Sequence, residues 1–451
     1  MTEAQIQALG PALADFLDPF LFCCADTRTF AHLHAYCRGL LSDLPRKSVE
    51  PIALAAGTPV RTLQEFLRDH LWDHDRATGL LRRHVAGLLD ELPDDGLGVV
   101  LVIDETATPK KGDKTPGVQR QWCGRLGKQD NCVVTVHTAV CKGRYKALVD
   151  ADLFLPESWS DDRPRCRAAG VPDTLTHRPK WRIALGQLDR VLADGLTPSW
   201  LTFDEDYGKA PELLAGLDGR RLRFVGEVAR SWPCSTGRPQ AGQPGRRADE
   251  VARHDPLFTG RPWRRVRLER QTSGVQVWQV KAARVWLATK GLSGTRPYWL
   301  IWAPCEATGE EKYFVSNAGE QVPVTTLLRA GFCRWNVEHG LRLSKSELGF
   351  GHFEGRHYLG LLRHLALCLL TLAFVAEQAA GLRGGKRRGD RRAGVPCAGG
   401  GVRGVAGDAA GDEPAAVHGG SHPAPPGTQP TSQAITTTET EATPLPPTVA
   451  L

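Results

Sequence analysis

Short apolar segments separated by a helical segment occupy residues 98–228, and this alternation constrains the fold more than any other feature of the chain. The apolar segments have the length and the β-branched content of buried strands. They are residues 98–103, 132–140, 147–155, 199–203 and 222–228. Residues 178–195 have the apolar spacing of a helix. Strands that alternate with helices predict an α/β core.

The remainder of the chain divides by composition into regions around this core. We expect five parts: a helical domain, the first part of the α/β core, a β-rich insertion, the last helices of the core, and a disordered tail. They are residues 1–95, 96–228, 229–322, 323–383 and 384–451. In the first part, residues 46–67 read as two short helices around a Gly-Thr-Pro break. This pattern is typical of a DNA-binding helix-turn-helix, and equally of two packed helices that touch no DNA.

The β-rich insertion and the tail differ sharply in composition. Residues 230–247 are rich in Pro, Gly and Arg and read as a loop. Four segments with strand character follow and predict an antiparallel module. They are residues 263–271, 275–288, 297–304 and 312–318. Beyond residue 381 the chain has no aromatic residue and is rich in Gly, Ala, Pro and Thr, so we expect disorder.

Charge and cysteine content narrow the class of protein. The chain has 57 basic and 50 acidic residues, a net charge of +7, which is compatible with a nucleic-acid partner but does not establish one. Its 12 cysteines include no C-x-x-C pair, which argues against a zinc ribbon and a disulfide scaffold. The N-terminus shows no signal-peptide pattern, so we expect a cytoplasmic protein. The apolar run 365–375 is short of the ~20 residues of a membrane span, which favours a buried helix.

Two carboxylates follow apolar strands directly. Asp104 comes after residues 98–103, and Asp204 comes after residues 199–203. Each is either a turn-initiating residue or a metal ligand beside a phosphate-rich substrate. Asp206 is a competitor of Asp204, which we favour because it follows its strand at once. Lys110 and Lys111 lie in a basic loop after Asp104 and are candidate DNA contacts.

A third candidate, Glu338, lies in a helical segment among basic residues. At about 100° per residue, Arg334, Arg342 and Lys345 fall on the same face as Glu338. An ordinary surface pair between Arg334 and Glu338 would explain part of this pattern and is worth only ~0.3–0.5 kcal/mol. Glu347 and Glu354 are competing acids nearby.

Three carboxylates on separate elements suit phosphoryl transfer with two metal ions. They can hold two Mg²⁺ roughly 3.5–4 Å apart, with Mn²⁺ as a substitute. Arginine and lysine beside them can bind the DNA backbone. We therefore interpret Asp104, Asp204 and Glu338 as candidate metal ligands, and Arg334, Arg342 and Lys345 as candidate DNA contacts.

These residues lie in segments that resemble bacterial insertion-sequence transposases of the DDE type, in the group with a β-rich insertion before the final Glu. The similar segments have the sequences VIDETATPKKG, PGVQRQWCGRLGKQDNC, SWSDDRPRCRAAGVP and WLTFDEDYG; they are residues 102–112, 116–132, 158–172 and 200–208. The family signature Tyr-x₂-Arg-x₃-Glu-x₆-Lys is matched by Arg334, Glu338 and Lys345. Gly331 stands where the family has Tyr.

The resemblance implies an RNase H-like core, a mixed five-stranded sheet flanked by helices. It also implies recognition of terminal repeats, strand cleavage by hydrolysis and strand transfer into target double-stranded DNA, carried out by a homodimer without a membrane partner. By this resemblance Asp104, Asp204 and Glu338 are the metal ligands, and Arg334 and Lys345 contact transposon-end DNA. Two alternatives remain: a transposase remnant that only binds DNA, and a metal-dependent endonuclease without strand transfer.

Several weaker features complete the sequence interpretation. His352, Glu354 and Arg356 follow the candidate helix and are expected to orient it or to touch DNA, whereas His364 is expected to be structural. Tryptophans in or beside the insertion, at 232, 263 and 278, are expected mainly to pack in the core. Family members continue in helical sequence where this tail begins, so we hypothesise a frameshift near residue 385.

Overall fold

The computed structural model describes residues 8–240, 244–270, 274–289 and 293–384. Side chains are described in these ranges except at 269–270, 293–295, 336–346 and 382–384. Met1–Asp390 form one compact unit. The tail beyond Gly384 lies outside the described residues, so its disorder and its origin by frameshift remain predictions.

The central sheet contains both parallel and antiparallel strand pairs. β1 (Val100–Pro109) pairs antiparallel with β3 (Lys128–Lys142) and parallel with β5 (Trp200–Thr202). β2 (Gln119–Cys123) and β4 (Tyr145–Leu153) both pair antiparallel with β3. The first four residues of β1 are buried, which explains its unbroken apolar run. The predicted α/β class with a mixed five-stranded sheet is confirmed.

A second sheet is antiparallel and begins where the first one ends. β6 (Val225–Val228) adjoins β5, because Leu201 and Phe224 form a parallel bridge. β6 also pairs with β12 (Glu311–Ser316), so a strand that the sequence assigned to the core belongs to the second sheet. The strand order is β6-β12-β11-β10-β7-β8, with β9 on β10. The other strands are β7 (Pro233–Ser235), β8 (Arg246–Arg247), β9 (Arg264–Arg270), β10 (Gly274–Ala288) and β11 (Ser293–Pro304).

Two segments differ from their predicted structure. The loop assigned to residues 230–247 is wrong at its ends, where β7 pairs with β8. Strands of two or three residues carry no readable periodicity, which is why the sequence did not predict them. Two helices also lie in this region, α12 (Ala248–His254) and α13 (Pro256–Thr259). The domain boundaries proposed from sequence remain predictions, because the chain from Met1 to Asp390 forms one unit.

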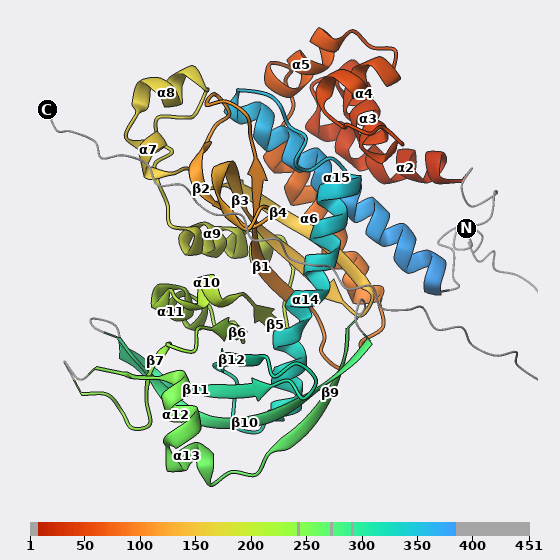
Figure 1. Cartoon of the computed structure of the whole chain (residues 1–451). Coiled ribbons are helices and arrows are strands. Elements are labelled where there is room, and N and C mark those ends of the chain that lie inside the picture. Colours follow the sequence, from red (N-terminus) through yellow and green to blue (C-terminus); the bar gives the residue numbers. More distant parts are fainter. Residues whose placement is uncertain (1–7, 241–243, 271–273, 290–292, 385–451) are drawn as a thin grey trace, which may run out of the picture. The chain divides into compact units, whose positions relative to one another are not determined.

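Helices cover the central sheet and connect its strands. α9 (Lys180–Ala193) packs on β3 and β4, and α14 (Val324–Glu347) packs against β1, β5 and β6. Short helices occupy the connections before and after β5 (Figure 1). They are α7 (Glu157–Ser160), α8 (Arg163–Ala168), α10 (Glu205–Gly208) and α11 (Pro211–Gly219).

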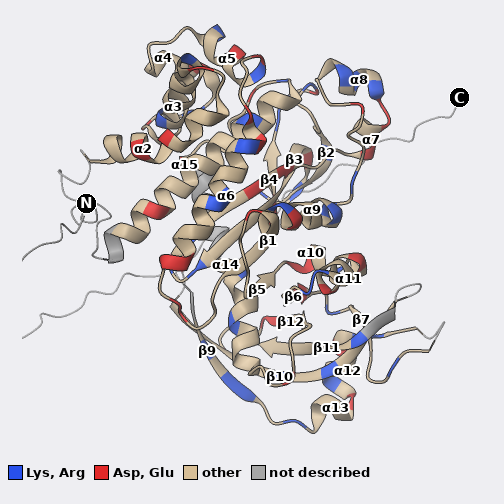
Figure 2. Cartoon of the chain, turned by 180° about the vertical axis from the view of Figure 1, so that it is seen from behind, with Lys and Arg blue, Asp and Glu red and all other residues tan. Residues whose placement is uncertain are grey.

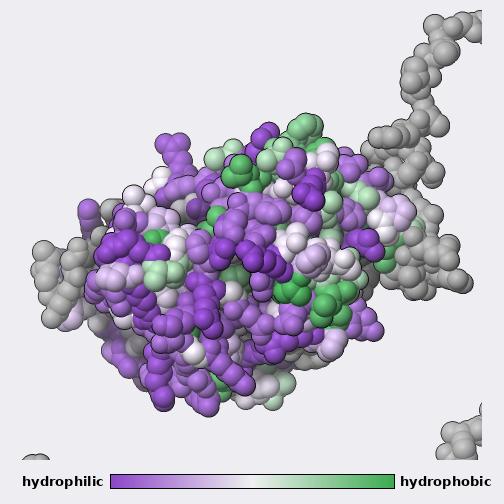
Figure 3. Space-filling view, turned by 90° about the horizontal axis from the view of Figure 1, so that it is seen from above, coloured by the Kyte–Doolittle hydropathy of each residue, from purple (hydrophilic) through white to green (hydrophobic). Residues whose placement is uncertain are grey.

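The N-terminal region is helical, as predicted. The carboxylates of Asp26 and Asp73 cap two of its helices by accepting hydrogen bonds from the Thr29 and Arg76 amides, at 2.7 and 2.9 Å. The elements are α2 (Leu9–Leu17), η1 (Asp18–Cys23), α3 (Thr27–Leu41), α4 (Val49–Ala55), α5 (Val60–Arg68) and α6 (His74–Glu91). The Gly-Thr-Pro break separates α4 from α5, and a DNA role for this pair remains a prediction. From above, the molecular surface is mostly hydrophilic, with scattered hydrophobic patches (Figure 3).

The apolar helix α15 (Tyr358–Gly384) is the longest in the described part of the chain. Its segment Tyr358–Gly381 is long and apolar enough to cross a membrane, but 78% of its most apolar window is buried inside the protein. α15 runs along β4 and α6 and also contacts α3 and α5 (Figure 1). This burial supports the interpretation of a buried helix rather than a span.

A buried ion cluster ties α6, α9 and β4 together. The Asp150 carboxylate, 4% exposed, accepts from the Arg82 guanidinium at 3.0 Å and from the Arg190 guanidinium at 2.9 Å. Arg82 also donates to Asp194 at 2.7 Å. Each charge in the cluster is met by an opposite charge, which is the condition for burying it.

Two polar side chains of α15 fasten the N-terminal helices to it. The Arg363 guanidinium donates to the Trp72 carbonyl at 2.7 Å and to the Phe66 and Leu67 carbonyls at 3.3 Å. These carbonyls lie at the C-terminal end of α5 and just beyond it, where the helix has no further backbone N–H groups to bond its last carbonyls. The Nδ1 atom of His364 lies 3.0 Å from the Tyr36 hydroxyl of α3, which agrees with the structural role expected for this histidine.

Replacing Arg363 with Met should destabilise the protein, because the Leu67 and Trp72 carbonyls lose the guanidinium as donor and the Phe66 carbonyl keeps only the Trp72 indole N–H. We expect the free energy of unfolding to fall by about 2–4 kcal/mol. R356M is the matched control: Arg356 is exposed, and its loss should change stability by less than about 0.5 kcal/mol. Chemical denaturation measures both variants, and equal stabilities would contradict the docking role of Arg363.

His364 should make stability depend on pH. Burial lowers the pKa of its imidazole from 6.5 to about 4. The unfolded chain therefore binds a proton that the folded chain does not, and stability is lost as the pH falls from 6.5 towards 4. Between pH 7 and pH 5 the wild type should lose on the order of 2 kcal/mol more than H364Q. Parallel stability-versus-pH curves for the two proteins would refute this assignment.

Candidate active site

Asp104 lies within β1, and Asp204 lies two residues beyond the end of β5, the parallel neighbour of β1. Val100, Leu101 and Val102 of β1 pair with Trp200, Leu201 and Thr202 of β5, a constant offset of 200 − 100 = 100 residues. Both aspartates raise the pKa of the Tyr207 hydroxyl, so they lie in one region of the structure. The carboxyl ends of parallel strands form one edge of the sheet, where ligands of open α/β sheets bind. The structure therefore brings together the first two predicted ligands.

The two aspartates are held by different local contacts. The Asp104 carboxylate accepts from the amide of Glu105 at 2.7 Å. The Asp204 carboxylate caps α10 by accepting from the amide of Tyr207 at 3.1 Å. The competitor Asp206 has a side chain that is 64% exposed and forms an ion pair with Lys209 at 2.6 Å. This geometry favours Asp204 over Asp206 as a partner of Asp104.

The Asp204 carboxyl is in an environment short of positive charge. Burial raises its pKa to about 6, and Asp206 and Glu105 add to the rise. The hydrogen bond from Tyr207 and the charge of Arg334 act in the opposite direction and are weaker than burial. A buried carboxylate with a raised pKa is typical of a functional site, because a bound cation would stabilise its charged form.

Glu105 and Tyr207 complete this oxygen-rich site, and sequence reasoning missed both. The Glu105 carboxylate does not compensate the charge of Asp204. It is itself paired, because the Lys180 ammonium of α9 donates to its Oε1 atom at 2.6 Å. Its Oε2 and the Tyr207 hydroxyl are buried and have no hydrogen-bond partner among the described residues. Burial raises the pKa of Tyr207 well above its ordinary value, and the carboxylates of Glu105, Asp104 and Asp204 raise it further. Only their position directly after the strand-end acids could have indicated them.

These groups fit a divalent cation. Carboxylate oxygens are the ligands that Mg²⁺ prefers, and an orphaned buried oxygen such as Glu105 Oε2 gains a partner when a cation binds. No group of three His, Cys, Asp or Glu side chains able to hold a metal occurs in the described part of the chain. The side chain of Glu338, the predicted third ligand, lies outside that part.

The predicted third ligand, Glu338, lies on α14. The helix runs without interruption from Val324 to Glu347, as predicted, and packs against the strands that carry both aspartates. Glu338 is one turn beyond Arg334, about 6 Å along the axis. The side chains of Glu338, Arg342 and Lys345 lie outside the described residues, so their shared face remains a prediction.

Arg334 is held at the point where the two sheets meet. Its guanidinium donates to the carboxylate of Glu227 on β6 at 3.3 Å, and Lys312 on β12 donates to the same carboxylate at 2.5 Å. The Glu227 side chain is 8% exposed. Glu227 could not be singled out from the sequence, because its two partners are 85 and 107 residues away.

Gly331 has a steric reason to differ from the family's Tyr. A Cβ atom at this position would lie 3.1 Å from Phe314 of β12 and 3.1 Å from Val225 of β6. Its carbonyl also accepts from the Thr202 hydroxyl of β5 at 3.3 Å. Position 331 therefore faces the packed sheets, and this close approach leaves no room for an aromatic ring.

The two lysines after β1 have different surroundings. The Lys110 ammonium donates to the Phe353 carbonyl at 2.5 Å and to the Gly351 carbonyl at 3.3 Å, and burial lowers its pKa to about 8. A DNA contact through Lys110 would require it to leave these carbonyls. Lys111 is exposed.

The remaining candidates have mostly structural contacts. Glu354 is ion-paired with Arg46, and the Nδ1 atom of His352 accepts from the amide of Lys47 at 3.0 Å. Glu347 is exposed at the end of α14. Trp232 and Trp278 are buried, as expected for core residues, whereas Trp263 is 43% exposed and packs on Trp302.

The Glu227 cluster predicts the behaviour of two glutamates that share Lys312. E227Q should lower the free energy of unfolding by about 3 kcal/mol, because two buried cations lose their counter-charge. E310Q is the control: Glu310 pairs with Lys312 at 3.2 Å, but its side chain is 47% exposed, so the loss should stay below about 1 kcal/mol. Urea denaturation compares the two, and an equal loss would show that Glu227 has no special role.

Comparisons with known proteins agree with this geometry. The family model described as DDE superfamily endonuclease matches residues 20–284, more than half of the chain, and includes Asp104 and Asp204 but ends before Glu338. The chain is also 26% identical over 346 residues to the probable transposase for insertion sequence element IS701 of Microchaete diplosiphon, across 73% of this chain and 77% of that protein. The resemblance to insertion-sequence transposases of the DDE type is therefore confirmed, and the chain belongs to the DDE superfamily endonucleases.

Proposed function

We propose that this protein is a transposase that binds the terminal inverted repeats of an insertion sequence, cleaves DNA strands and joins the 3′ ends to target DNA. The observation that carries the proposal is that Asp104 of β1 and Asp204, just beyond β5, both act on Tyr207, while the helix that bears Arg334 and Glu338 packs against the same two strands. The relative from insertion sequence element IS701 supports the same function. We further propose that two copies of the chain act together on paired DNA ends.

We also propose that the core is RNase H-like. The order β4-β3-β1-β5, extended by the bridge from β5 to β6, supports this assignment. In this arrangement the central strand β1 has one antiparallel and one parallel neighbour. Asp104 lies on this central strand, two residues beyond the part of it that pairs with β5, and a DNA strand would bind there.

The chain's own residues define what the site does during the reaction. Asp104, Asp204 and Glu338 would hold divalent cations, which when bound supply an activated hydroxyl and stabilise the leaving oxygen. Arg334, fixed by Glu227, presents a charge beside Asp204, where the scissile phosphate must bind. Partial burial of Asp104, Asp204 and Arg334 strengthens these electrostatic interactions.

Replacing the candidate ligands tests the proposal directly. D104N, D204N and E338Q should each reduce Mg²⁺-dependent cleavage of labelled DNA carrying the element's ends by roughly 100-fold or more, because a metal ligand is lost. DNA binding, measured by fluorescence anisotropy, should persist in all three. D206N is the matched control and should cleave at the wild-type rate, since Asp206 is exposed and paired with Lys209.

The products separate the candidate activities. Cleavage with joined product supports a transposase, cleavage alone an endonuclease, and binding alone a remnant that only occupies DNA ends. Undiminished cutting by E338Q would move the third ligand to another acid, such as Glu347 or Glu354. Loss of cutting in D206N together with normal cutting in D204N would exclude the assigned second ligand.

A further inference from the structure

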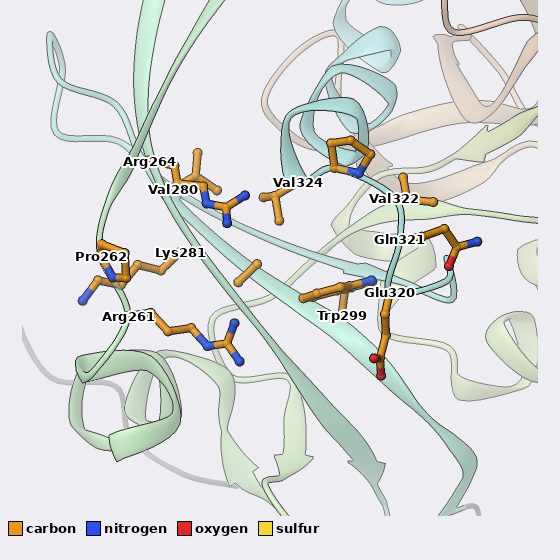
Figure 4. A pocket seen from close by; sticks show the side chains of 12 residues that line it. Arg261, Pro262, Arg264, Val280, Lys281, Trp299, Glu320, Gln321, Val322 and Val324 are labelled. Atoms are coloured by element: carbon orange, nitrogen blue, oxygen red, sulfur yellow. The ribbon is translucent and has the colours of Figure 1, made fainter.

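A cavity of about 200 Å³ lies on the second sheet, away from the aspartates. It is bounded by the residues that lead into β9, by β10 and β11, and by the start of α14 (Figure 4). Val280, Trp299 and Val324 give it partly apolar walls. The full lining is Arg261, Pro262, Arg264, Val280, Lys281, Ala282, Trp299, Glu320, Gln321, Val322, Pro323 and Val324.

Positive charge predominates in this cavity. Arg261, Arg264 and Lys281 line it, against the single acid Glu320. The Arg261 Nε donates to the Leu257 carbonyl at 3.0 Å, and the Lys281 ammonium donates to the Thr259 carbonyl at 3.4 Å. Within the part of the chain that the structure describes, no carboxylate forms a salt bridge with any of the three cations.

Nearby arginines of the same sheet and its helices differ in this respect. Arg246 pairs with Asp255 at 2.7 Å, Arg253 pairs with Glu311, and Arg265 pairs with Glu306 at 2.8 Å. The sequence therefore supplies carboxylates to arginines elsewhere in this region and not to those of the cavity. Cations gathered without counter-charge repel one another and favour an anionic ligand.

The cavity is connected to the candidate active site by one rigid element. α14 begins at Val324 in the cavity wall and reaches Arg334 ten residues later, about 15 Å along the helix axis. Glu338 follows at about 21 Å. For a duplex lying along α14, these lengths correspond to roughly four to six base pairs at 3.4 Å each.

We propose that this cavity binds a backbone phosphate of the DNA substrate, about four to six base pairs from the bond that is cut. The inference rests on the proposed function, which supplies DNA as the substrate. Arg261 and Arg264 provide the charge-assisted hydrogen bonds, and Lys281 adds a further charge. β9, which carries Arg264, is itself rich in arginine (Figure 2).

The salt dependence of DNA binding tests the proposal. Each phosphate contact contributes about 0.9 to the slope of log Kd against log salt concentration. With a 30-base-pair duplex of arbitrary sequence and the full chain, R261A/R264A should lower this slope by about 0.9, because the cavity binds one phosphate. R265A is the matched control: it removes a charge from the same strand, but one that is already paired with Glu306, so its slope should equal that of the wild type.

Thermal unfolding must be measured on the same proteins, so that a loss of binding is not a loss of fold. R264K keeps the charge and should keep the slope. A wild-type slope in a folded R261A/R264A protein overturns the proposal. A slope that R265A lowers equally also overturns the proposal, because the change would then reflect the loss of positive charge in general.

Phosphate ethylation interference locates the contact on the DNA. Using a duplex that the wild type cuts, ethylation four to six base pairs from the cut should weaken binding of the wild type and not of R261A/R264A. A different result is that pyrophosphate displaces DNA from the wild type but not from R261A/R264A, while ethylation has no effect. That result would assign the cavity to a free phosphate compound and overturn the DNA contact. If DNA cleavage depends on Asp104 but ethylation does not interfere with binding, this inference alone is refuted. If the protein neither binds nor cuts DNA, the proposed function is refuted.

Discussion

The buried carboxylate of Glu227 is the interaction on which the relation between the two sheets and the candidate site depends. It lies on β6, the strand that adjoins β5 of the first sheet and pairs with β12 of the second. Lys312 and Arg334 meet it from β12 and from α14. A buried charge must be compensated in a single geometry. That requirement fixes α14, both sheets and the Arg334 guanidinium with respect to one another.

The candidate site itself follows from parallel strand pairing. β1 and β5 pair in parallel, which brings Asp104 of β1 and Asp204, two residues beyond β5, into the region around Tyr207. Burial there raises the pKa of Asp204, and the orphaned oxygens of Glu105 and Tyr207 add to a region rich in oxygen and short of cations. The fold thus gathers negative charge that a bound divalent cation would compensate. In this way the pairing of two strands creates a site suited to the chemistry of phosphate esters.

Local sequence signals predicted the elements that are long or buried on both faces. β1 and β3 appear as apolar runs because both of their faces are covered, and α14 and α15 appear through their length. β2, β7 and β8 were missed, since short strands carry no period. β6 was assigned to the wrong sheet, because its pairing with β12 joins residues far apart in the chain. The same limit applies to the site: Asp104 and Asp204 could be predicted from strand ends, whereas Glu227 and Tyr207 acquire their importance only through tertiary contacts.

The close approach of α14 to the sheets at Gly331 has an evolutionary consequence. The atoms that would meet a side chain there belong to Phe314 and Val225, on two different strands. A return to the family's Tyr cannot be made by one substitution in this background, because overpacking a filled core is destabilising. Positions 225, 314 and 331 are therefore expected to change together among related proteins, and the effect of each substitution will depend on the state of the other two.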